Sequence, residues 1–285
     1  MENAEPAKAP LVTTLTTAFN SQRYLHCALQ SLCEQTLADI QILVVSDGST
    51  DRSSDIAREM AATDARIEVL DVARVGRSGA LNLGLEAARA PYVAIMDADD
   101  LAHPERLEIQ REVLEENPEF VGVGAKAAYF RGNGSRLPPM PARTPPGFED
   151  VTCHLRRHNP LPHSTMMFRR DPLVKLGGYD VRMLRQVDYE LYVRLAAVGQ
   201  RLARLEARLG GIRYHDTRNY QGGRQVGYRA SSLVQQANAL RVVPGSTRDM
   251  AYLPARAGFL VLRTVAPRYA TKRAGLARII ELDDE

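Results

Sequence analysis

Residues 92–100 have the sequence Tyr92-Val93-Ala94-Ile95-Met96-Asp97-Ala98-Asp99-Asp100, in which an apolar run ends in three carboxylates. A second run, Ile40-Gln41-Ile42-Leu43-Val44-Val45, ends in the polar segment Ser46-Asp47-Gly48-Ser49-Thr50-Asp51. Short, almost continuous apolar runs are typical of strands buried on both faces of a parallel sheet. Open α/β sheets bind ligands outside the carboxyl ends of their strands. We therefore expect both acidic clusters at a binding site.

Further strands and helices alternate around these two runs. The sequence predicts strands over 11–17 and 67–70, and helices over 25–33, 53–62 and 78–89. Such alternation predicts an α/β fold with a mostly parallel central sheet flanked by helices. Later in the chain, a proline- and glycine-rich loop is expected around 132–147, a short strand over 164–169 and a helix over 187–198.

Composition places the chain among ordinary globular proteins. Its 285 residues are 45% hydrophobic and 25% charged, which excludes a disordered or fibrous chain. Three cysteines, with no Cys-x-x-Cys pair, indicate a reducing compartment. The first residues lack the basic start and apolar stretch of a secretory signal, and no run reaches the roughly 18 apolar residues of a membrane span. These features predict a cytoplasmic protein.

Charge is unevenly distributed along the chain. The overall balance, 37 basic against 34 acidic residues, is too slight to indicate a nucleic-acid partner. Residues 201–285 hold 15 basic and 7 acidic residues, a net charge of +8, which leaves −5 for the first 200. Basic residues after Asp249 are interspersed with apolar ones. Two uses stay open: a peripheral contact with an anionic membrane, or a helix packed on the core.

Asp97-x-Asp99 carries the strongest chemical signal. Two carboxylates at the rim of an apolar sheet repel each other, so a cation is expected to neutralise them. Mg²⁺ or Mn²⁺ takes oxygen ligands and keeps positions open for a diphosphate. The alternative is that residues 97–100 only cap a helix beginning near Pro104.

Five blocks, at residues 17–20, 29–36, 44–51, 76–85 and 96–100, resemble in order and spacing the nucleotide-binding half of the family 2 inverting glycosyltransferases. The resemblance is dense from Leu11 to Gln110 and continues thinly to about Asn219. It implies a GT-A fold that binds a nucleotide-diphosphate sugar and a divalent metal. The expected organisation is a disordered segment 1–10, a GT-A domain 11–221 with a nucleotide-binding half 11–110 and an acceptor half 111–221, and a helical, basic C-terminal appendage 222–285.

The resemblance assigns the nucleoside to three residues. Asp47 matches the aspartate that binds the nucleobase, and a carboxylate there would accept the imide N–H of uracil. Thr17 and Phe19 match positions at the nucleoside, where an aromatic face can pack on base or ribose. The alternative for Phe19 is a core position.

The diphosphate and sugar are assigned by the same resemblance. Arg77 falls where related sequences carry a basic residue that could contact the diphosphate, although an exposed loop arginine is the alternative. Asp97 matches a residue contacting the donor ribose or sugar, and Asp99 matches the metal-binding aspartate. His215, in Arg213-Tyr214-His215, falls where many relatives place a histidine that adds a metal or phosphate contact.

Inversion also requires a base that deprotonates the acceptor hydroxyl. The resemblance assigns this role to Asp188 in the segment Gln186-Val187-Asp188-Tyr189-Glu190-Leu191, although Val187 stands where glutamate is common. A helix N-cap is the alternative for Asp188, and both roles can hold together. His163 matches a family strand that precedes the base, where it could lie near donor or acceptor or be a buried, hydrogen-bonded side chain.

The sequence thus predicts a metal-dependent inverting glycosyltransferase. Its donor would be a UDP-sugar, and its acceptor a glycan or lipid-linked hydroxyl in cell-surface polysaccharide or glycolipid synthesis. Two alternatives stay open: a non-catalytic nucleotide-sugar or glycan-binding protein, which would be expected to lose the base, and a nucleotidyltransferase, which should carry a glycine-rich signature near its first strand. A Rossmann dehydrogenase is disfavoured because no Gly-x-Gly-x-x-Gly follows the first strand.

Overall fold

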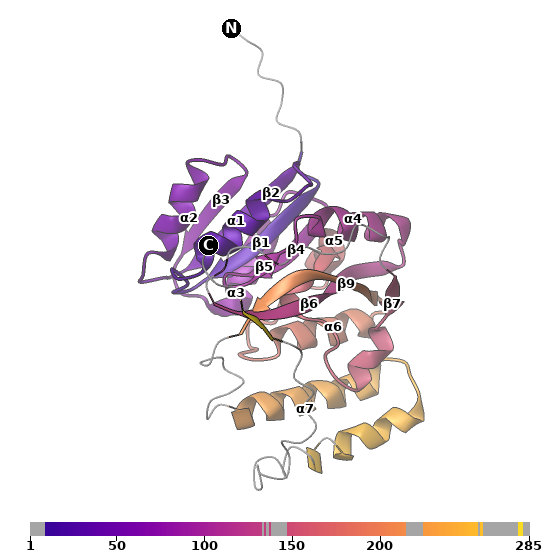
Figure 1. Ribbon diagram of the computed structural model, residues 1–285. Coiled ribbons are helices and arrows are strands. Elements are labelled where there is room, and N and C mark those ends of the chain that lie inside the picture. The colour runs from indigo at the N-terminus through magenta and orange to yellow at the C-terminus, as the bar shows by residue number, and fades with distance from the viewer. Residues whose placement is uncertain are drawn as a thin grey trace.

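The computed structural model describes residues 9–132, 134, 137, 147–214, 225–255, 257–258 and 279–281. The described strands form one ten-stranded sheet in the order β3-β2-β1-β4-β8-β6-β9-β5, with β10 paired to β6 and β7 to β9 (Figure 1). The strands are β1 Val12–Ala18, β2 Ile40–Asp47, β3 Ile67–Val72, β4 Tyr92–Asp97, β5 Leu101–Ala102, β6 Phe120–Arg131, β7 Phe148–Asp150, β8 Met167–Arg169, β9 Arg201–Arg213 and β10 Ile279–Glu281.

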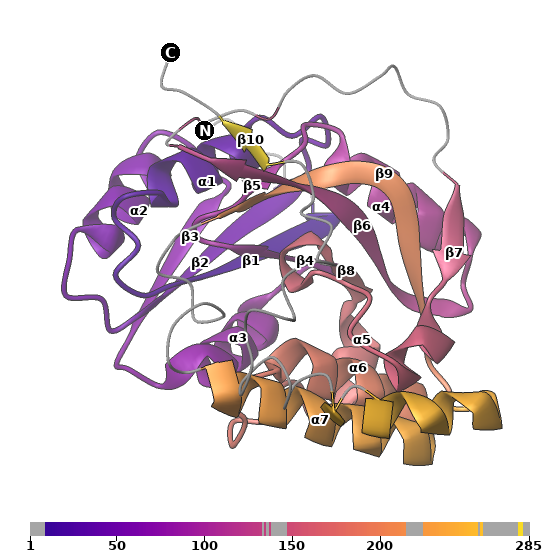
Figure 2. The same cartoon turned by 60° about the horizontal axis from the view of Figure 1, so that its bottom comes forward.

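Helices lie on both faces of this sheet (Figure 2). The α-helices are α1 Leu25–Cys33, α2 Ser53–Ala61, α3 Gly76–Ala87, α4 Arg106–Glu116, α5 Arg170–Lys175, α6 Val187–Ala197 and α7 Gln225–Val242. Three short 3-10 helices are η1 Thr152–Arg156, η2 His163–Thr165 and η3 Thr247–Ala251. The predicted α/β fold with a helix-flanked, mostly parallel sheet is confirmed.

The first half of the sheet is parallel, and its strands β1, β2 and β4 are buried on both faces. β1 pairs with β2 and β4, and β2 with β3. One apolar cluster joins Val12 and Val44 to α1, α2 and α4, and the other joins Leu15 and Leu43 to α3 and α6. Every residue of β2 is therefore buried. The strands and helices predicted in the first 97 residues are confirmed to within a few residues at each end.

The register aligns the strand ends that carry the candidate residues. Thr17 on β1 lies opposite Val45 on one side and Asp97 on the other. Ala18 lies opposite Ser46, the residue before Asp47. The ends of β1, β2 and β4 are thus level, and the expected placement of both acidic clusters at one edge is confirmed.

The second half of the sheet differs from the prediction. β6 and β9 form a long parallel pair that the sequence did not predict. The strand expected over 164–169 is shorter, because residues 163–165 turn in η2 and only β8 pairs with β4 and β6. The short strands β5 and β7 pair antiparallel with β9.

α7 and the residues up to Asp249 pack against α6 and η1. α7 lies along α6 (Figure 2), and Arg156 of η1 donates to the carbonyl of Leu240 at 3.2 Å and pairs with Asp249 at 3.1 Å. Within the predicted helical appendage, residues 225–242 are helical, whereas residues 279–281 form β10, which pairs with β6 through its backbone. His215 and most of the basic segment after Asp249 lie outside the described residues. Among the helices that the structure describes, none combines the length and apolar character needed to cross a membrane.

We predict that Gly84→Ala destabilises the protein. A β-carbon added at Gly84 in α3 would lie 2.1 Å from Cδ1 of Leu15, which is fully buried in β1. Alanine stabilises a helix by about 1 kcal/mol relative to glycine, but overpacking a core costs about 1–3 kcal/mol, so the clash outweighs the gain. Urea denaturation measures the free energy of unfolding. Gly147→Ala, where nothing lies within 4 Å of the added carbon, is the control; equal stability of both variants would contradict the prediction.

Candidate active site

Asp47 ends β2 and is 2% exposed, and its carboxylate accepts hydrogen bonds from residues 74–76. The backbone N–H groups of Val75 and Gly76 donate to its Oδ1 at 2.6 and 3.3 Å, and the Arg74 guanidinium pairs with its Oδ2. Gly48, the next residue, has a φ of +66°, and a β-carbon there would lie 2.8 Å from the backbone nitrogen of Arg74. A glycine is therefore needed for the chain to turn this close to the start of α3.

Arg74 connects Asp47 to Phe19. Its guanidinium stacks 3.5 Å from the centre of the Phe19 ring, and that ring is 44% exposed. The alternative that Phe19 fills the core is therefore wrong. Phe19 follows β1 directly, so a flat aromatic face and a guanidinium lie together beside the Asp47 carboxylate, and Thr17 lies two residues earlier at the end of the same strand.

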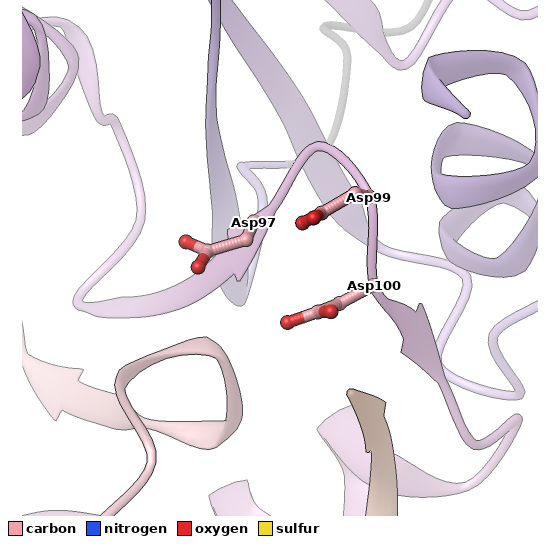
Figure 3. Close-up of side chains that lie close together, drawn as sticks. All are labelled: Asp97, Asp99 and Asp100. Atoms are coloured by element: carbon pink, nitrogen blue, oxygen red, sulfur yellow. The ribbon is translucent and has the colours of Figure 1, made fainter. Parts of the chain in front are cut away.

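Three carboxylates gather on the turn after β4 (Figure 3). Oxygens of Asp97, Asp99 and Asp100 lie within 4.8 Å of one another. The Asp100 backbone N–H donates to the Asp97 carbonyl at 3.2 Å, which tightens the turn. An all-oxygen donor set of this kind fits a hard divalent cation such as Mg²⁺ or Mn²⁺. The alternative that this segment caps the following helix is not supported, because α4 begins at Arg106 with no side-chain cap.

Arginines from three elements surround these carboxylates. Arg77 at the start of α3 pairs with Asp97 at 2.6 Å. Arg213 at the end of β9 donates its backbone N–H to Asp100 at 2.9 Å and its Nε to the Asp99 carbonyl at 2.8 Å. Burial lowers the pKa of Arg106 to about 10, while Asp100 acts in the opposite direction. Positive charge from Arg77, Arg106 and Arg213 offsets the repulsion among the carboxylates.

Asp188 is the second residue of α6, where the helix dipole favours a negative charge. The Asn159 side-chain amide donates to Asp188 Oδ2 at 2.7 Å. The residue before α6, Gln186, has a left-handed φ of +56°, so the chain enters the helix through a sharp turn. No side chain caps α6 at Gln186, and the alternative of Asp188 as N-cap does not apply because it lies inside the helix.

His163 is buried between two tyrosines. Its Nδ1 lies 2.9 Å from the Tyr192 hydroxyl and its Nε2 3.1 Å from the Tyr179 hydroxyl. Burial lowers the pKa of His163 to about 4, against the opposing charges of Asp188 and Asp97. Of the two expectations for His163, the structure shows the buried, hydrogen-bonded side chain. The charges of Asp188, Arg77 and Asp97 also act on this ring, but burial is the largest cause of the shift in its pKa.

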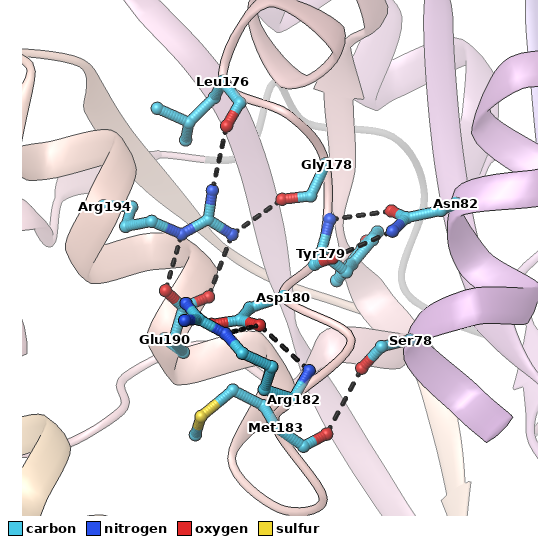
Figure 4. A network of polar contacts seen from close by, with 10 residues as sticks. All are labelled: Ser78, Asn82, Leu176, Gly178, Tyr179, Asp180, Arg182, Met183, Glu190 and Arg194. Atoms are coloured by element: carbon cyan, nitrogen blue, oxygen red, sulfur yellow. Dashed lines mark hydrogen bonds and ion pairs between the residues drawn. The ribbon is translucent and has the colours of Figure 1, made fainter.

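A polar network joins α3 to α6 (Figure 4). Asn82 of α3 donates to the Tyr179 carbonyl at 2.8 Å and accepts from the Tyr179 N–H at 2.7 Å. Arg194 of α6 donates to the Gly178 carbonyl at 2.6 Å while pairing with Glu190. A β-carbon at Gly178 would lie 2.4 Å from the Asn82 side chain, so only glycine permits this approach. The helix that carries Asp188 is therefore tied to the helix that carries Arg77.

The structure brings six of the seven predicted site residues that it describes to the same sheet edge: Thr17, Phe19, Asp47, Arg77, Asp97 and Asp99. Asp188 is linked to that edge by residues 159–164, because Asn159 donates to Asp188 and Ser164 accepts the Asp97 N–H. His215 lies outside the described residues. Sequence reasoning missed Arg74, Asn159 and Arg213. Arg74 and Arg213 stand beside blocks that the sequence did single out, but nothing in the sequence marks their partners.

The chain is similar in sequence to known glycosyltransferases. A model of the family described as glycosyl transferase family 2 matches residues 13–186. The amylovoran biosynthesis glycosyltransferase AmsE of Erwinia amylovora is 31% identical over 199 residues, 68% of this chain and 73% of AmsE. The uncharacterized glycosyltransferase EpsJ of Bacillus subtilis is 39% identical over 116 residues, but the match spans only 34% of EpsJ and 40% of this chain.

Solved structures share the fold at low sequence identity. Residues 1–349 of S. aureus TarS, in complex with UDP-GlcNAc, align with a TM-score of 0.66 and 16% identity over 92% of this chain and 76% of that one. The mannosyltransferase PcManGT of Pyrobaculum calidifontis, in complex with GDP-Man and Mn²⁺, aligns with a TM-score of 0.64 and 19% identity over 92% and 79%. At these identities the alignments show the fold alone.

We predict that His163 makes the folded protein less stable in acid. Its pKa falls from 6.5 to about 4 on folding, so between these values the unfolded chain binds a proton that the folded protein does not. Stability is therefore lost as the pH falls from about 6.5 towards 4, by on the order of 3 kcal/mol for a shift of this size. Denaturant unfolding at a series of pH values measures the slope. His163→Gln should reduce that slope, and an unchanged slope would contradict the prediction.

Proposed function

Because the chain belongs to glycosyltransferase family 2, whose model covers residues 13–186, we propose that it is a metal-dependent inverting glycosyltransferase. It moves a sugar from a nucleotide-diphosphate sugar to an acceptor hydroxyl. The observation that carries this proposal is the common position of Asp47, Asp97 and Asp99 at the level ends of β1, β2 and β4. Nucleobase, diphosphate and metal groups then have separate partners along one edge.

The donor in this proposal is a UDP-sugar. Asp47 Oδ1 is already engaged by two backbone N–H groups, so Oδ2 is the oxygen that accepts the imide N–H of uracil. Arg74 would turn from Oδ2 towards the flanking carbonyl oxygens of the base, while Phe19 packs on the ring or the ribose. A single available carboxylate oxygen suits the one imide donor of uracil better than the paired donors of guanine.

Asp99, with Asp97 and Asp100 beside it, would hold Mn²⁺ or Mg²⁺. The bound metal supplies positive charge that offsets the diphosphate as it leaves. Arg77, at the start of α3, would contact the diphosphate, and its ion pair with Asp97 supports this assignment. A contact from His215 remains part of this proposal.

Asp188 takes the proton of the acceptor hydroxyl as it attacks the anomeric carbon. The acceptor is a glycan or a lipid-linked hydroxyl in cell-surface polysaccharide or glycolipid synthesis, and the similarity to AmsE, a glycosyltransferase of amylovoran biosynthesis, supports a biosynthetic role. In this proposal the reaction takes place on the cytoplasmic side of the membrane. A peripheral membrane contact through the basic C-terminal residues belongs to the same proposal.

We expect Asp99→Asn to weaken Mn²⁺ binding at least about tenfold, because a carboxylate ligand becomes a neutral amide. Electron paramagnetic resonance of free Mn²⁺ measures the affinity without any turnover. Asp55→Asn removes the same charge from an exposed position on α2 and should leave the affinity unchanged. Equal Mn²⁺ affinity in the Asp99 variant and the wild type would overturn the metal assignment.

We expect Asp188→Asn to retain UDP binding in the presence of Mn²⁺ but to lose UDP release from a panel of UDP-sugars by about 100-fold or more. The substitution keeps the shape of the side chain and removes only the base. Asp171→Asn, at an exposed site on α5, is the matched control. Undiminished turnover in the Asp188 variant would remove it from the base role, and UDP binding without turnover in the wild type would favour the non-catalytic binding protein.

A further inference from the structure

The six residues 159–164, Asn159-Pro160-Leu161-Pro162-His163-Ser164, touch both ends of the candidate active site. They follow η1 and include the first two residues of η2, and they belong to neither the nucleotide-binding strands nor α6. At one end Asn159 contacts the Asp188 carboxylate. At the other, the Ser164 hydroxyl accepts the backbone N–H of Asp97 at 3.0 Å. The segment therefore spans the distance between the base and the donor carboxylates.

The orientation of the Asn159 amide is fixed from both sides. Its Oδ1 accepts the Leu161 N–H at 3.1 Å, and its Nδ2 donates to Asp188 Oδ2 at 2.7 Å. A flipped amide would place an oxygen against the carboxylate and an NH₂ against the N–H, which repel. Because the contact uses Oδ2, Oδ1 is the oxygen of Asp188 that we assign to the acceptor hydroxyl.

The rest of the segment is anchored at several points. His163 bridges Tyr192, one helical turn after Asp188 in α6, and Tyr179 in the loop before that helix. Pro160 and Pro162 fix their own φ angles and so limit backbone motion. The side chain of Asn159 is thus presented to Asp188 by a backbone that is held to α6 and to β4.

We propose that Asn159 is a positioning residue that orients the Asp188 carboxylate towards the donor, with His163 and Ser164 fixing its segment between α6 and β4. This inference rests on the proposed role of Asp188 as the base. Asn159 does not touch the reacting atoms. It acts by holding one carboxylate oxygen, so that the other meets the acceptor hydroxyl at a defined angle.

Asn159→Asp is the discriminating variant. An aspartate keeps an oxygen for the Leu161 N–H, so the local turn is preserved, but it replaces the donor to Asp188 with a second carboxylate. We expect release of UDP from a UDP-sugar to fall by about 100-fold in kcat, the cost of a misplaced reacting group, with UDP affinity unchanged. Asn238→Asp, at an exposed position on α7, is the control for the same chemical change.

A stability cycle tests the contact without any turnover. Two carboxylates in contact share a proton, so the Asn159→Asp variant should lose stability relative to the wild type as the pH rises from about 5 to about 8. In the double variant Asn159→Asp with Asp188→Asn, residue 188 carries the amide donor and residue 159 carries the carboxylate acceptor. It should recover the lost stability at the higher pH but not the turnover, because the base has moved.

The outcomes separate this inference from the proposed function. If Asp188→Asn abolishes turnover while Asn159→Asp matches the wild type in kcat and in stability at each pH, Asp188 keeps its role as base and the positioning proposal is wrong. If Asp188→Asn retains full turnover, the base assignment fails first. If Asn159→Asp loses stability equally at both pH values and the double variant does not recover it, Asn159 has only a packing role and the proposal is overturned.

Discussion

Carboxylate charge concentrated at one edge of the sheet is the constraint on which the rest of this structure depends. Three of the acids there are compensated by groups that are distant in the sequence: Asp47 by Arg74, Asp97 by Arg77, and Asp100 by the backbone of Arg213. Uncompensated charge in such a setting is strongly destabilising. The start of α3 and the end of β9 therefore have to meet at this edge. The same requirement leaves a concentrated negative site that a divalent cation can stabilise further.

The parallel half of the fold follows from local sequence patterns, and the other half does not. Strands such as β2 are almost continuous apolar runs bounded by turn residues, so the hydrophobic pattern and the turn residues predict the same strand. In contrast, β9 is rich in Arg, Leu, Ala and Glu, which favour helices, yet it forms a strand along β6. β6 itself contains Gly122 and Gly124, where an added β-carbon would meet Phe168 and Leu161 at 2.5 and 2.7 Å. Glycines that are required for close packing resemble breakers when only the sequence is known.

The candidate site divides in a similar way. The acidic residues at strand ends could be predicted because the apolar strand and the carboxylates that follow it lie in one short segment of sequence. The partners could not, since Arg74 lies 27 residues from Asp47, Asn159 lies 29 from Asp188, and Arg213 lies 114 from Asp99. These contacts depend on how β9, η2 and α6 are positioned relative to the parallel strands, and tertiary packing determines those positions. The resemblance predicts which carboxylates form the site, and the structure shows which groups contact them.

The acidic first 200 residues and the basic remainder do not correspond to separate regions of the fold. Arg201 on β9 pairs with Asp150 at 2.8 Å, and Arg213 joins the acidic turn after β4. Conversely, Arg156 from the acidic first 200 residues forms an ion pair with Asp249 in the basic remainder. Ion pairs thus cross the boundary at residue 200 both ways, so part of the charge imbalance along the sequence is cancelled in space. A basic surface for an anionic membrane has to be built from arginines and lysines beyond these pairs, whereas those within the sheet already serve the core and the candidate active site.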